Sequence, residues 1–140
     1  MIKGLGVDLV DISRMEKIIA RWGDKFLKKI FTQRECTYCD KNSRSARHYA
    51  ARFAAKEALL KMLGTGLRAG INWTEMEVIR DDLGKPRVML QGRAGEIARA
   101  RGINNIHISL SHEQQYAVAQ VIGEGGPDND CTDTAADADG

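Results

Sequence analysis

Aromatic residues are scarce in this chain, at 6% of its 140 residues. A surface that stacks the bases of single-stranded nucleic acid needs several aromatic rings, so no nucleic acid partner is expected. Long apolar runs are missing as well, because none approaches the roughly 18 residues of a membrane helix. Asp8 interrupts the N-terminal apolar stretch before the core of a signal peptide can form. These absences predict a cytoplasmic protein without a membrane partner.

Cysteine is equally rare, and Cys36, Cys39 and Cys131 are too few and too odd in number for a disulfide scaffold. Cys36 and Cys39 have the CxxC spacing, but no second ligand pair follows at a spacing usual for zinc. A redox motif would follow a strand, whereas this pair lies in a helical stretch. Two ordinary thiols are expected. A small zinc or thiol-redox protein is an alternative that rests on these two residues alone.

Net charge is low, at +2, but the charge is unevenly distributed. Six acids and no base lie between Gly123 and Gly140, which leaves 21 bases and 13 acids, a charge of +8, on the remaining chain. A basic body with an acidic tail indicates a polyanionic ligand or partner. The tail has too few apolar residues to fold by itself and is expected to be dispensable for the fold.

The first half of the chain predicts one strand followed by helices. Residues 2–10 form the strand, and Gly4 and Gly6 within it indicate that another element approaches its backbone closely. Capping boxes at Ser13 and Thr32 and a cap at Asp24 predict the starts of three short helices. A longer, alanine-rich helix spans 44–63 and ends at Gly64, before a glycine-rich loop over 64–70.

The second half predicts two hairpins with a helix between them. Residues 75–80 and 86–90 form the first hairpin, a helix contains 96–101, and residues 105–111 and 116–122 form the second. The pattern predicts a single α+β domain over 1–122, in which a small antiparallel sheet packs with a long helix.

Three charged residues are candidates for chemistry. Asp8 lies near the end of an apolar strand, where a buried carboxylate must be paired, hydrated or bound to a metal. Glu57 and Lys61 lie one turn apart on the long helix and either form an ordinary surface ion pair or serve a metal and its phosphate. Because Mg²⁺ commonly takes only one or two protein carboxylates, Asp8 and Glu57 suffice if the fold brings them together.

Two other groups of polar residues have both a structural and a functional interpretation. His107, Ser109 and Ser111 share one face of their strand, and His112 begins the next turn; they form a half-exposed polar face or line a phosphate site. Arg14, Lys17 and Arg21 share one face of the first helix, which is either solvated or a docking surface for an acidic helix with Met15 and Ile18 as apolar anchors.

Four motifs occur in an order that identifies a family. They are Gly6-Val7-Asp8 with Arg14 after it, the helical segment Arg-Phe-Ala-Ala-Lys-Glu-Ala-Leu-Leu-Lys over 52–61, Gly64-Thr65-Gly66, and His-Ile-Ser-Leu-Ser-His over 107–112. Over residues 1–122 the chain resembles the short bacterial holo-[acyl-carrier-protein] synthases of the 4′-phosphopantetheinyl transferase superfamily. The acidic tail and the cysteine pair fall outside the resemblance.

The resemblance implies a reaction. Phosphopantetheine is transferred from coenzyme A to a serine of apo acyl carrier protein, which leaves adenosine 3′,5′-bisphosphate. It implies Mg²⁺, with Mn²⁺ as a substitute, held by Asp8 and Glu57, with Glu57 as the base and Lys61 on the phosphate. Coenzyme A contacts are implied for seven further residues: Arg44, Arg52, Gly64, Gly66, His107, Ser111 and His112.

The resemblance also implies a trimer-forming fold. Longer members of the superfamily resemble two fused copies of this unit, with the metal acids in one half and the Ser-His pair in the other. A one-unit chain then takes the missing half from another subunit, so active sites at the interfaces of a homotrimer are expected. The rival interpretation, a non-catalytic basic module that binds acidic proteins, leaves Asp8, Glu57 and the Ser-His strand without a shared purpose.

Overall fold

The first strand, β1 (Ile2–Asp11), lies at one edge of a three-stranded antiparallel sheet in the computed structural model, which describes residues 1–126. The central strand is β5 (Tyr116–Glu124), and β4 (Asn105–His112) forms the other edge. Leu9 of β1 and Ser111 of β4 both lie opposite Val118 of β5, so the three share one face of the sheet. The α+β class and the antiparallel sheet expected from the sequence are confirmed.

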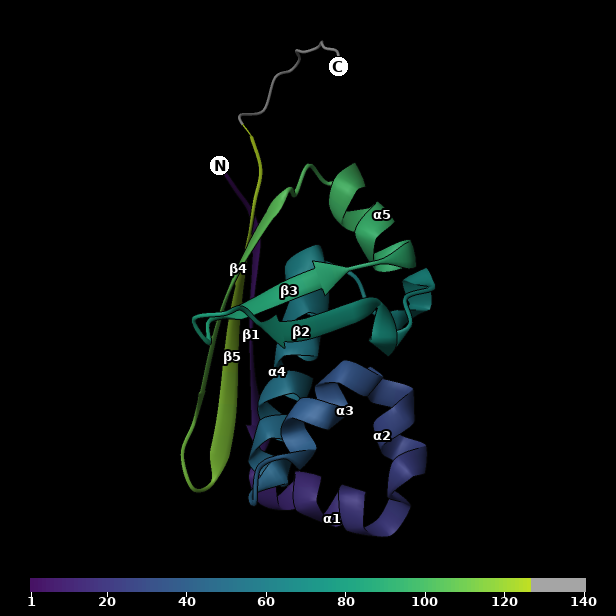
Figure 1. The fold of residues 1–140 in the computed structure, drawn as a ribbon. Coiled ribbons are helices and arrows are strands. Elements are labelled where there is room, and N and C mark those ends of the chain that lie inside the picture. Colours follow the sequence, from purple (N-terminus) through teal and green to yellow (C-terminus); the bar gives the residue numbers. More distant parts are fainter. Residues whose placement is uncertain (127–140) are drawn as a thin grey trace.

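The long helix α4 (Ser45–Leu63) packs on the inner face of this sheet, and the smaller elements surround it (Figure 1). Both termini of the described chain lie at the same end of the sheet, and the three short helices gather at the other end. The remaining elements are α1 (Ile12–Trp22), α2 (Asp24–Ile30), α3 (Gln33–Asp40), the 3₁₀ turns η1 (Leu67–Ala69) and η2 (Trp73–Glu75), the paired strands β2 (Met76–Arg80) and β3 (Pro86–Leu90), and α5 (Gly92–Ala100).

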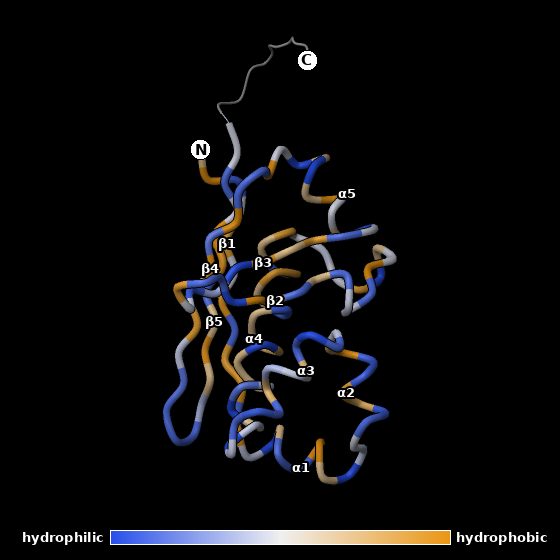
Figure 2. Tube along the Cα trace, in the orientation of Figure 1, coloured by the Kyte–Doolittle hydropathy of each residue, from blue (hydrophilic) through white to orange (hydrophobic). Residues whose placement is uncertain are grey.

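Two glycines of β1 let the strand touch α4 backbone to backbone. A Cβ atom on Gly4 would lie 2.3 Å from the carbonyl oxygen of Met62, and one on Gly6 would lie 2.1 Å from that of Ala58. No side chain fits at either position without a shift of the backbone. The close approach that the two glycines predict is therefore confirmed, and its partner is the long helix. Val10 of β1 and Val121 of β5 pack with apolar residues of α4, and hydrophobic stretches of the sheet lie beside this helix (Figure 2).

The opposite face of the sheet exposes apolar side chains. Leu5, Val7 and Leu9 of β1 are 62%, 51% and 59% exposed, respectively. Val118 and Ile122 of β5 lie beside them and are partly exposed. Apolar side chains that adjoin across two strands mark a surface where another protein packs.

Most helix ends follow the expected capping chemistry. Thr32 and Glu35 form a complete capping box, and Gly64 ends α4 in the left-handed conformation at φ 74°. The expected cap at Ser13 is wrong: the Asp11 carboxylate accepts hydrogen bonds from the backbone N–H groups of Ser13 and Arg14, so α1 begins earlier. Asp11 is the last residue of β1, and this position places its carboxylate beside both N–H groups.

Three other expected boundaries are also shifted. Asp24 is the first residue of α2 rather than its cap, and α5 begins at Gly92, earlier than the expected helical stretch. The sheet continues past residue 122, because β5 ends at Glu124 and Gly125 exchanges hydrogen bonds with Met1. Most of the expected acidic tail, residues 127–140, lies outside the described residues. Within residues 1–126, no helix has both the length and the apolarity to span a bilayer.

The contact between β1 and α4 predicts that Gly6→Ala destabilises the protein. An added methyl group meets a helix carbonyl that cannot rotate away, so we expect a loss of about 2 kcal/mol or more in the free energy of unfolding. Gly66→Ala is the matched control, because a Cβ there meets nothing within 4 Å. Urea unfolding followed by circular dichroism measures both. An unchanged midpoint for Gly6→Ala would contradict the tight contact.

Candidate active site

The β1–α4 contact brings together the three residues expected to carry the chemistry. The Lys61 ammonium lies 3.2 Å from Asp8 Oδ1 and donates to the carbonyl oxygen of Val7 at 3.0 Å. Glu57 lies one turn before Lys61 on α4 and is close enough to Asp8 for the two carboxylates to interact electrostatically. A strand and a helix far apart in the sequence thus place two acids and a lysine at one edge of the sheet.

The pKa of Glu57 is shifted upward from that of a free surface acid. Partial burial raises its pKa above the ordinary glutamate value, the nearby Asp8 carboxylate raises it further, and Lys61 partly opposes the shift. Desolvation and a like charge both disfavour the ionised form. A cation between the two acids would relieve that repulsion.

The donor set at this edge fits a hard divalent cation. Asp8 and Glu57 offer carboxylate oxygens, the ligand type that Mg²⁺ prefers, and Mg²⁺ commonly takes the rest of its shell from substrate phosphate and water. In residues 1–126, no three His, Cys, Asp or Glu side chains cluster as a complete metal cage. The site therefore suits a metal that arrives with a phosphate ligand.

A second group of polar residues surrounds the ring of Tyr38, on α3. The guanidinium of Arg52 lies 4.2 Å from the ring centroid, and that of Arg80 lies 5.5 Å away. The His48 ring packs edge-on against Tyr38 and, at 5.5 Å, against the ring of His112. Arg52 is 1% exposed, and its Nε atom has no hydrogen-bond partner. This Tyr38 cluster thus holds a buried donor whose bonding capacity is not used.

The Tyr38 cluster is positively charged. Burial lowers the pKa of His48, and His112, Arg52, Arg47 and Arg80 lower it further. The pKa of His112 falls for similar reasons, with Arg47 and Arg80 as the charges. Within the described part of the chain, none of the three arginines forms an ion pair with a carboxylate. Uncompensated cations around an unused donor are suited to bind an anion.

The two groups lie on opposite faces of α4. Arg52 and Lys61 are nine residues apart, which at about 100° per residue places them about 180° apart around the helix. Lys61 points to β1 at one edge of the sheet, whereas the rings of His48 and His112 meet at the β4 edge. A single chain therefore does not bring its acids and its basic cluster to one point.

Other residues expected at the site are distributed along the same elements. Ser111 lies on the outer face of the sheet, and His112 turns inward to His48. His107 also lies on the outer face, where Nε2 is 2.9 Å from Glu124 Oε1, so the structure does not bring it to the Tyr38 cluster.

The remaining nucleotide candidates flank α4 at its two ends. Arg44 occupies the N-cap position of α4 and lines a groove of about 780 Å³ between α1 and the β4–β5 turn. Gly64 and Gly66 follow the other end of the helix, and Gly64 lies against the Arg101 guanidinium.

Two members of the Tyr38 cluster, His48 and Arg80, belong to none of the motifs, and neither does the nearby Arg47. One sequence pattern could have indicated His48. Arg44, His48 and Arg52 follow one another at four-residue intervals, so they lie along one face of α4. Arg80 ends β2, and no sequence pattern singles it out.

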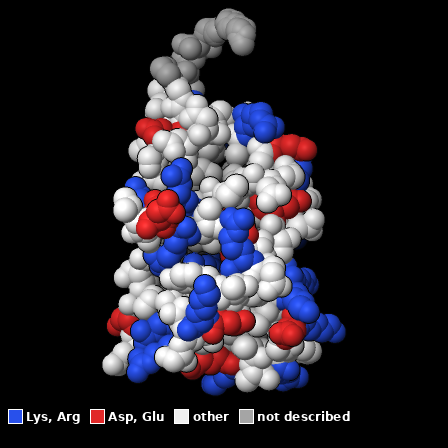
Figure 3. Space-filling model, viewed as in Figure 1, with Lys and Arg blue, Asp and Glu red and all other residues white. Residues whose placement is uncertain are grey.

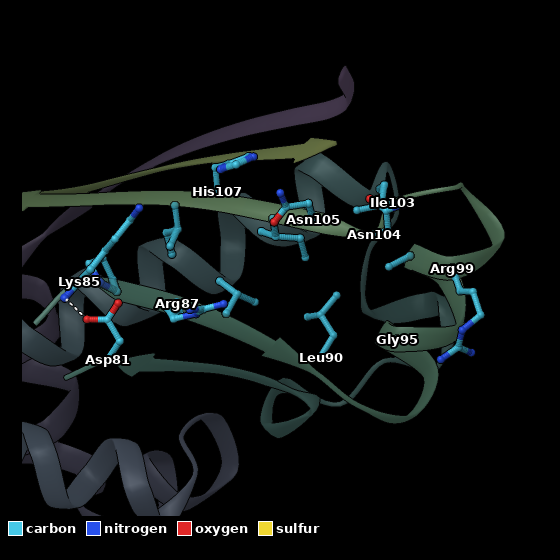
Figure 4. A pocket seen from close by; sticks show the side chains of 15 residues that line it. Asp81, Lys85, Arg87, Leu90, Gly95, Arg99, Ile103, Asn104, Asn105 and His107 are labelled. Carbon is cyan, nitrogen blue, oxygen red and sulfur yellow. Dashed lines mark hydrogen bonds between the residues drawn. The ribbon is translucent and has the colours of Figure 1, made fainter. Parts of the chain in front are cut away.

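A separate cleft of about 720 Å³ opens between β3, β4 and α5 (Figure 4). Lys85, Arg87 and Arg99 contribute its basic side chains, Val88, Leu90 and Ile106 are among its apolar ones, and the His107 ring points away from it toward Glu124 on β5. The cleft contains none of the acids at the β1 edge. It is therefore a basic surface distinct from the site of Asp8, Glu57 and Lys61.

The helix expected to dock an acidic partner is exposed where the sequence predicts. Arg14, Lys17 and Arg21 are exposed on α1, and basic side chains gather over this end of the molecule with acids between them (Figure 3). Met15 is wrong as an apolar anchor, because it is 2% exposed and packs into the core beneath α1. Trp22 is instead 52% exposed, with the Arg21 guanidinium 5.1 Å from its ring.

The cysteine pair has the features of ordinary thiols. Cys36 and Cys39 are both free, and Cys39 is fully buried. Burial raises the pKa of Cys36 and raises that of Cys39 to about 12, which suppresses the reactive thiolate.

Comparison with known proteins identifies the family. Residues 4–121 match the family described as "4'-phosphopantetheinyl transferase superfamily". The chain belongs to this superfamily. It is 52% identical over 125 residues to the holo-[acyl-carrier-protein] synthase of Syntrophus aciditrophicus, an alignment that covers 89% of this chain and 98% of the relative.

Solved structures of the family share the fold. The chain is 31% identical to the holo-[acyl-carrier-protein] synthase of Neisseria meningitidis, with a TM-score of 0.81 over 89% of this chain and 99% of the other. The Bacillus anthracis synthase, solved in complex with coenzyme A (3′,5′-ADP), is 35% identical, with a TM-score of 0.74 over 90% and 99%. The reaction of a holo-[acyl-carrier-protein] synthase, transfer of phosphopantetheine from coenzyme A to apo acyl carrier protein, is therefore the activity of this chain.

The raised pKa of Glu57 predicts how the metal-free transferase responds to pH. Above the ordinary glutamate pKa of about 4.3, the unfolded chain releases this proton before the folded chain does. Glu57 therefore lowers stability as pH rises from that value to its raised pKa, after which its effect is constant. Melting temperatures in chelator should fall less steeply across this window for Glu57→Gln than for the wild type. Glu16→Gln, at an exposed acid on α1, is the control. Parallel curves for Glu57→Gln and wild type would contradict the assignment.

Proposed function

We propose that the transfer occurs between two copies of the chain, with the acids of one copy facing the basic cluster of another. The observation that carries the proposal is the separation of the two groups on opposite faces of α4 and at opposite edges of the sheet. Each group lacks what the other has: the acids attract a metal and its phosphate, and the Tyr38 cluster holds cations without counter-ions.

In this proposal Asp8 and Glu57 hold Mg²⁺, or Mn²⁺, with the diphosphate of coenzyme A. When bound, the cation neutralises charge on the diphosphate and on the oxygen that leaves. Lys61 adds a fixed positive charge beside the same phosphate and is held in place by Val7 and Asp8. Such a displacement needs positioning and charge neutralisation more than covalent help from the enzyme.

Glu57 is the proposed base that removes the proton from the carrier serine as the serine oxygen attacks the phosphorus. Its raised pKa brings its affinity for a proton closer to what a base needs near neutral pH. The proton is transferred to a Glu57 carboxylate oxygen, and adenosine 3′,5′-bisphosphate leaves with the electrons of the broken P–O bond.

The neighbouring copy would bind the nucleotide through its basic cluster. Arg52 and His112 are the proposed phosphate contacts, with Arg44 and Ser111 at the margins and His107 in reach only after it separates from Glu124. Gly64 and Gly66, after the C-terminal end of α4, would offer a backbone without side chains to the adenosine.

The exposed apolar face of the sheet supports a closed oligomer, which we propose to be a homotrimer. Leu5, Val7 and Leu9 would be buried when the sheets of neighbouring copies meet. Closed rotational symmetry repeats one interface until no apolar face is left exposed. It also repeats the meeting of a β1 edge with a neighbour's β4 edge, one active site for each interface.

The acyl carrier protein would dock on α1. Its acidic surface would be attracted by Arg14, Lys17 and Arg21. Trp22 and half-buried Ile18 provide the apolar contacts of this surface.

The reaction and its metal site can be tested together by mass spectrometry. Apo carrier protein incubated with this chain, coenzyme A and Mg²⁺ should gain one phosphopantetheine group, and a chelator should prevent the gain. Asp8→Ala and Glu57→Ala should each reduce the rate by about 10²- to 10³-fold or more while the protein stays folded. A wild-type rate for either variant at saturating Mg²⁺ would refute the metal site. Coenzyme A left unbound and carrier left unmodified would favour the non-catalytic module.

The shared site can be tested by mixing inactive chains. Glu57→Ala and the double variant Ser111→Ala/His112→Ala should each be inactive alone, because each lacks one half of every site. Refolded together, they should regain part of the wild-type activity, since some interfaces then combine two intact halves. Light scattering with one chain tagged shows that mixed oligomers form. Mixed oligomers without activity would exclude the shared site.

The docking surface predicts a specific kinetic effect. Reversal of Arg14 and Arg21 to glutamate should raise KM for the carrier protein about tenfold at low salt, because attraction becomes repulsion. The affinity for coenzyme A should change little. The double variant Lys85→Glu/Arg99→Glu, which reverses two exposed bases at the other end of the molecule, controls for the change in net charge. An unchanged KM for the α1 variant would mean that this face is only solvated.

A further inference from the structure

Lys56, the residue before Glu57 in the sequence, forms a buried ion pair that the proposed mechanism does not use. The Lys56 ammonium lies 2.8 Å from Glu35 Oε1, and the two side chains are both 0% exposed. Removing two charges from water is costly, so such a pair requires every remaining hydrogen-bonding position to be satisfied. In this protein that condition is met.

The Lys56 ammonium uses all three of its donors, each on a different element. It donates to the carbonyl oxygen of Ile30 on α2 at 2.8 Å and to that of Trp73 on η2 at 3.1 Å. Glu35 of α3 accepts the third bond. Three directional bonds to three separate elements hold the end of this side chain at one point.

Glu35 extends the network in turn. Its Oε1 accepts from the backbone N–H of Thr32 at 2.9 Å, and its Oε2 accepts from that of Val78 on β2 at 2.8 Å. The carboxylate is therefore anchored by backbone groups on both of its oxygens. The Lys56 ammonium cannot shift without breaking bonds to α2, η2 or this anchored carboxylate.

This network restrains the rotation of α4 about its own axis. Neighbouring residues on a helix point about 100° apart, so the direction of Lys56 determines the direction of Glu57. The contact of Gly4 and Gly6 with α4 sets how close the strand and the helix lie, but packing of backbone on backbone is less directional than hydrogen bonds. The ammonium of Lys56 supplies the directional restraint.

We infer that Lys56 and Glu35 are positioning residues of the transferase: their buried pair fixes the rotation of α4 and so aims Glu57 and Lys61 at Asp8. The inference rests on the proposed metal role of Asp8 and Glu57. It adds that the metal site depends on a network on the other side of the helix, which touches neither metal nor substrate.

The test compares Lys56→Met with a matched variant at another buried charged residue, next to the Lys56–Glu35 network. Glu77→Gln is that control, because Glu77 is buried, accepts from the Thr32 hydroxyl and acts on Lys56 only electrostatically, since the three Lys56 donors are used by other groups. Mn²⁺ affinity is measured by electron paramagnetic resonance, at a temperature where circular dichroism shows every variant folded. Lys56→Met should bind Mn²⁺ about tenfold more weakly and lose a similar factor in kcat, while KM for the carrier protein stays within twofold. Glu77→Gln should keep the wild-type Mn²⁺ affinity.

A second variant covers the case in which Lys56→Met fails to fold. Lys56→Met/Glu35→Gln removes both charges, so no unpaired charge stays buried, and it should fold while still binding Mn²⁺ weakly. Wild-type affinity and kcat in whichever of the two variants folds would overturn the inference and leave the pair a stabilising role only.

Failure of the proposed metal site is distinguishable from failure of this inference. If wild-type protein binds Mn²⁺ no better than Asp8→Ala does, the metal proposal fails. A crystal structure of whichever Lys56 variant folds then tests separately whether the buried pair positions Lys61. Loss of the contacts from Lys61 to Val7 and Asp8, at 3.0 and 3.2 Å in the wild-type protein, would support it. Both contacts unchanged would overturn it.

Discussion

The contact between β1 and α4 is the constraint on which the site depends. At Gly4 and Gly6 the strand backbone lies against helix carbonyls, at a distance that no side chain permits. This spacing lets Asp8 reach Lys61 at 3.2 Å and brings it close enough to act on the pKa of Glu57. Two carboxylates held this close repel each other and attract a cation, and the packing of β1 on α4 sustains that repulsion. The meeting of Asp8, Glu57 and Lys61 is thus a consequence of how closely two backbones approach.

Helix α4 also keeps the acids at the β1 edge apart from the Tyr38 cluster. Its β1 side presents Glu57 and Lys61 to Asp8, and its opposite side carries Arg52 and His48, which pack on Tyr38. Neither group is complete for diphosphate chemistry, since one repels anions without a metal and the other has no acid to hold one. The sheet repeats this division, with β5 between the two edge strands and an exposed apolar face on β1. A reaction that needs both groups therefore favours assembly, and the protein's apolar outer face provides a physical reason for assembly to occur.

The sequence predicts local chemistry well and tertiary burial poorly. The close approach at Gly4 and Gly6, the capping box at Thr32 and the left-handed Gly64 each follow from a residue's own stereochemistry. Arg52 and Lys56 are both buried, but nothing local shows this, because their partners come from α2, α3 and η2. For the same reason Met15 is wrong as a surface anchor, and Arg80 and His48 become members of a cluster only when β2 and β4 approach α4.

A crystal structure of the protein with coenzyme A and Mg²⁺ tests the central claim most directly. The account predicts that the diphosphate lies against Asp8, Glu57 and Lys61 of one chain and that the nucleotide's other phosphate lies against Arg52 and His112 of a neighbouring chain. It predicts the same arrangement at every interface of a closed oligomer. Coenzyme A bound wholly by residues of one chain, or bound away from the β1 edge, would contradict it.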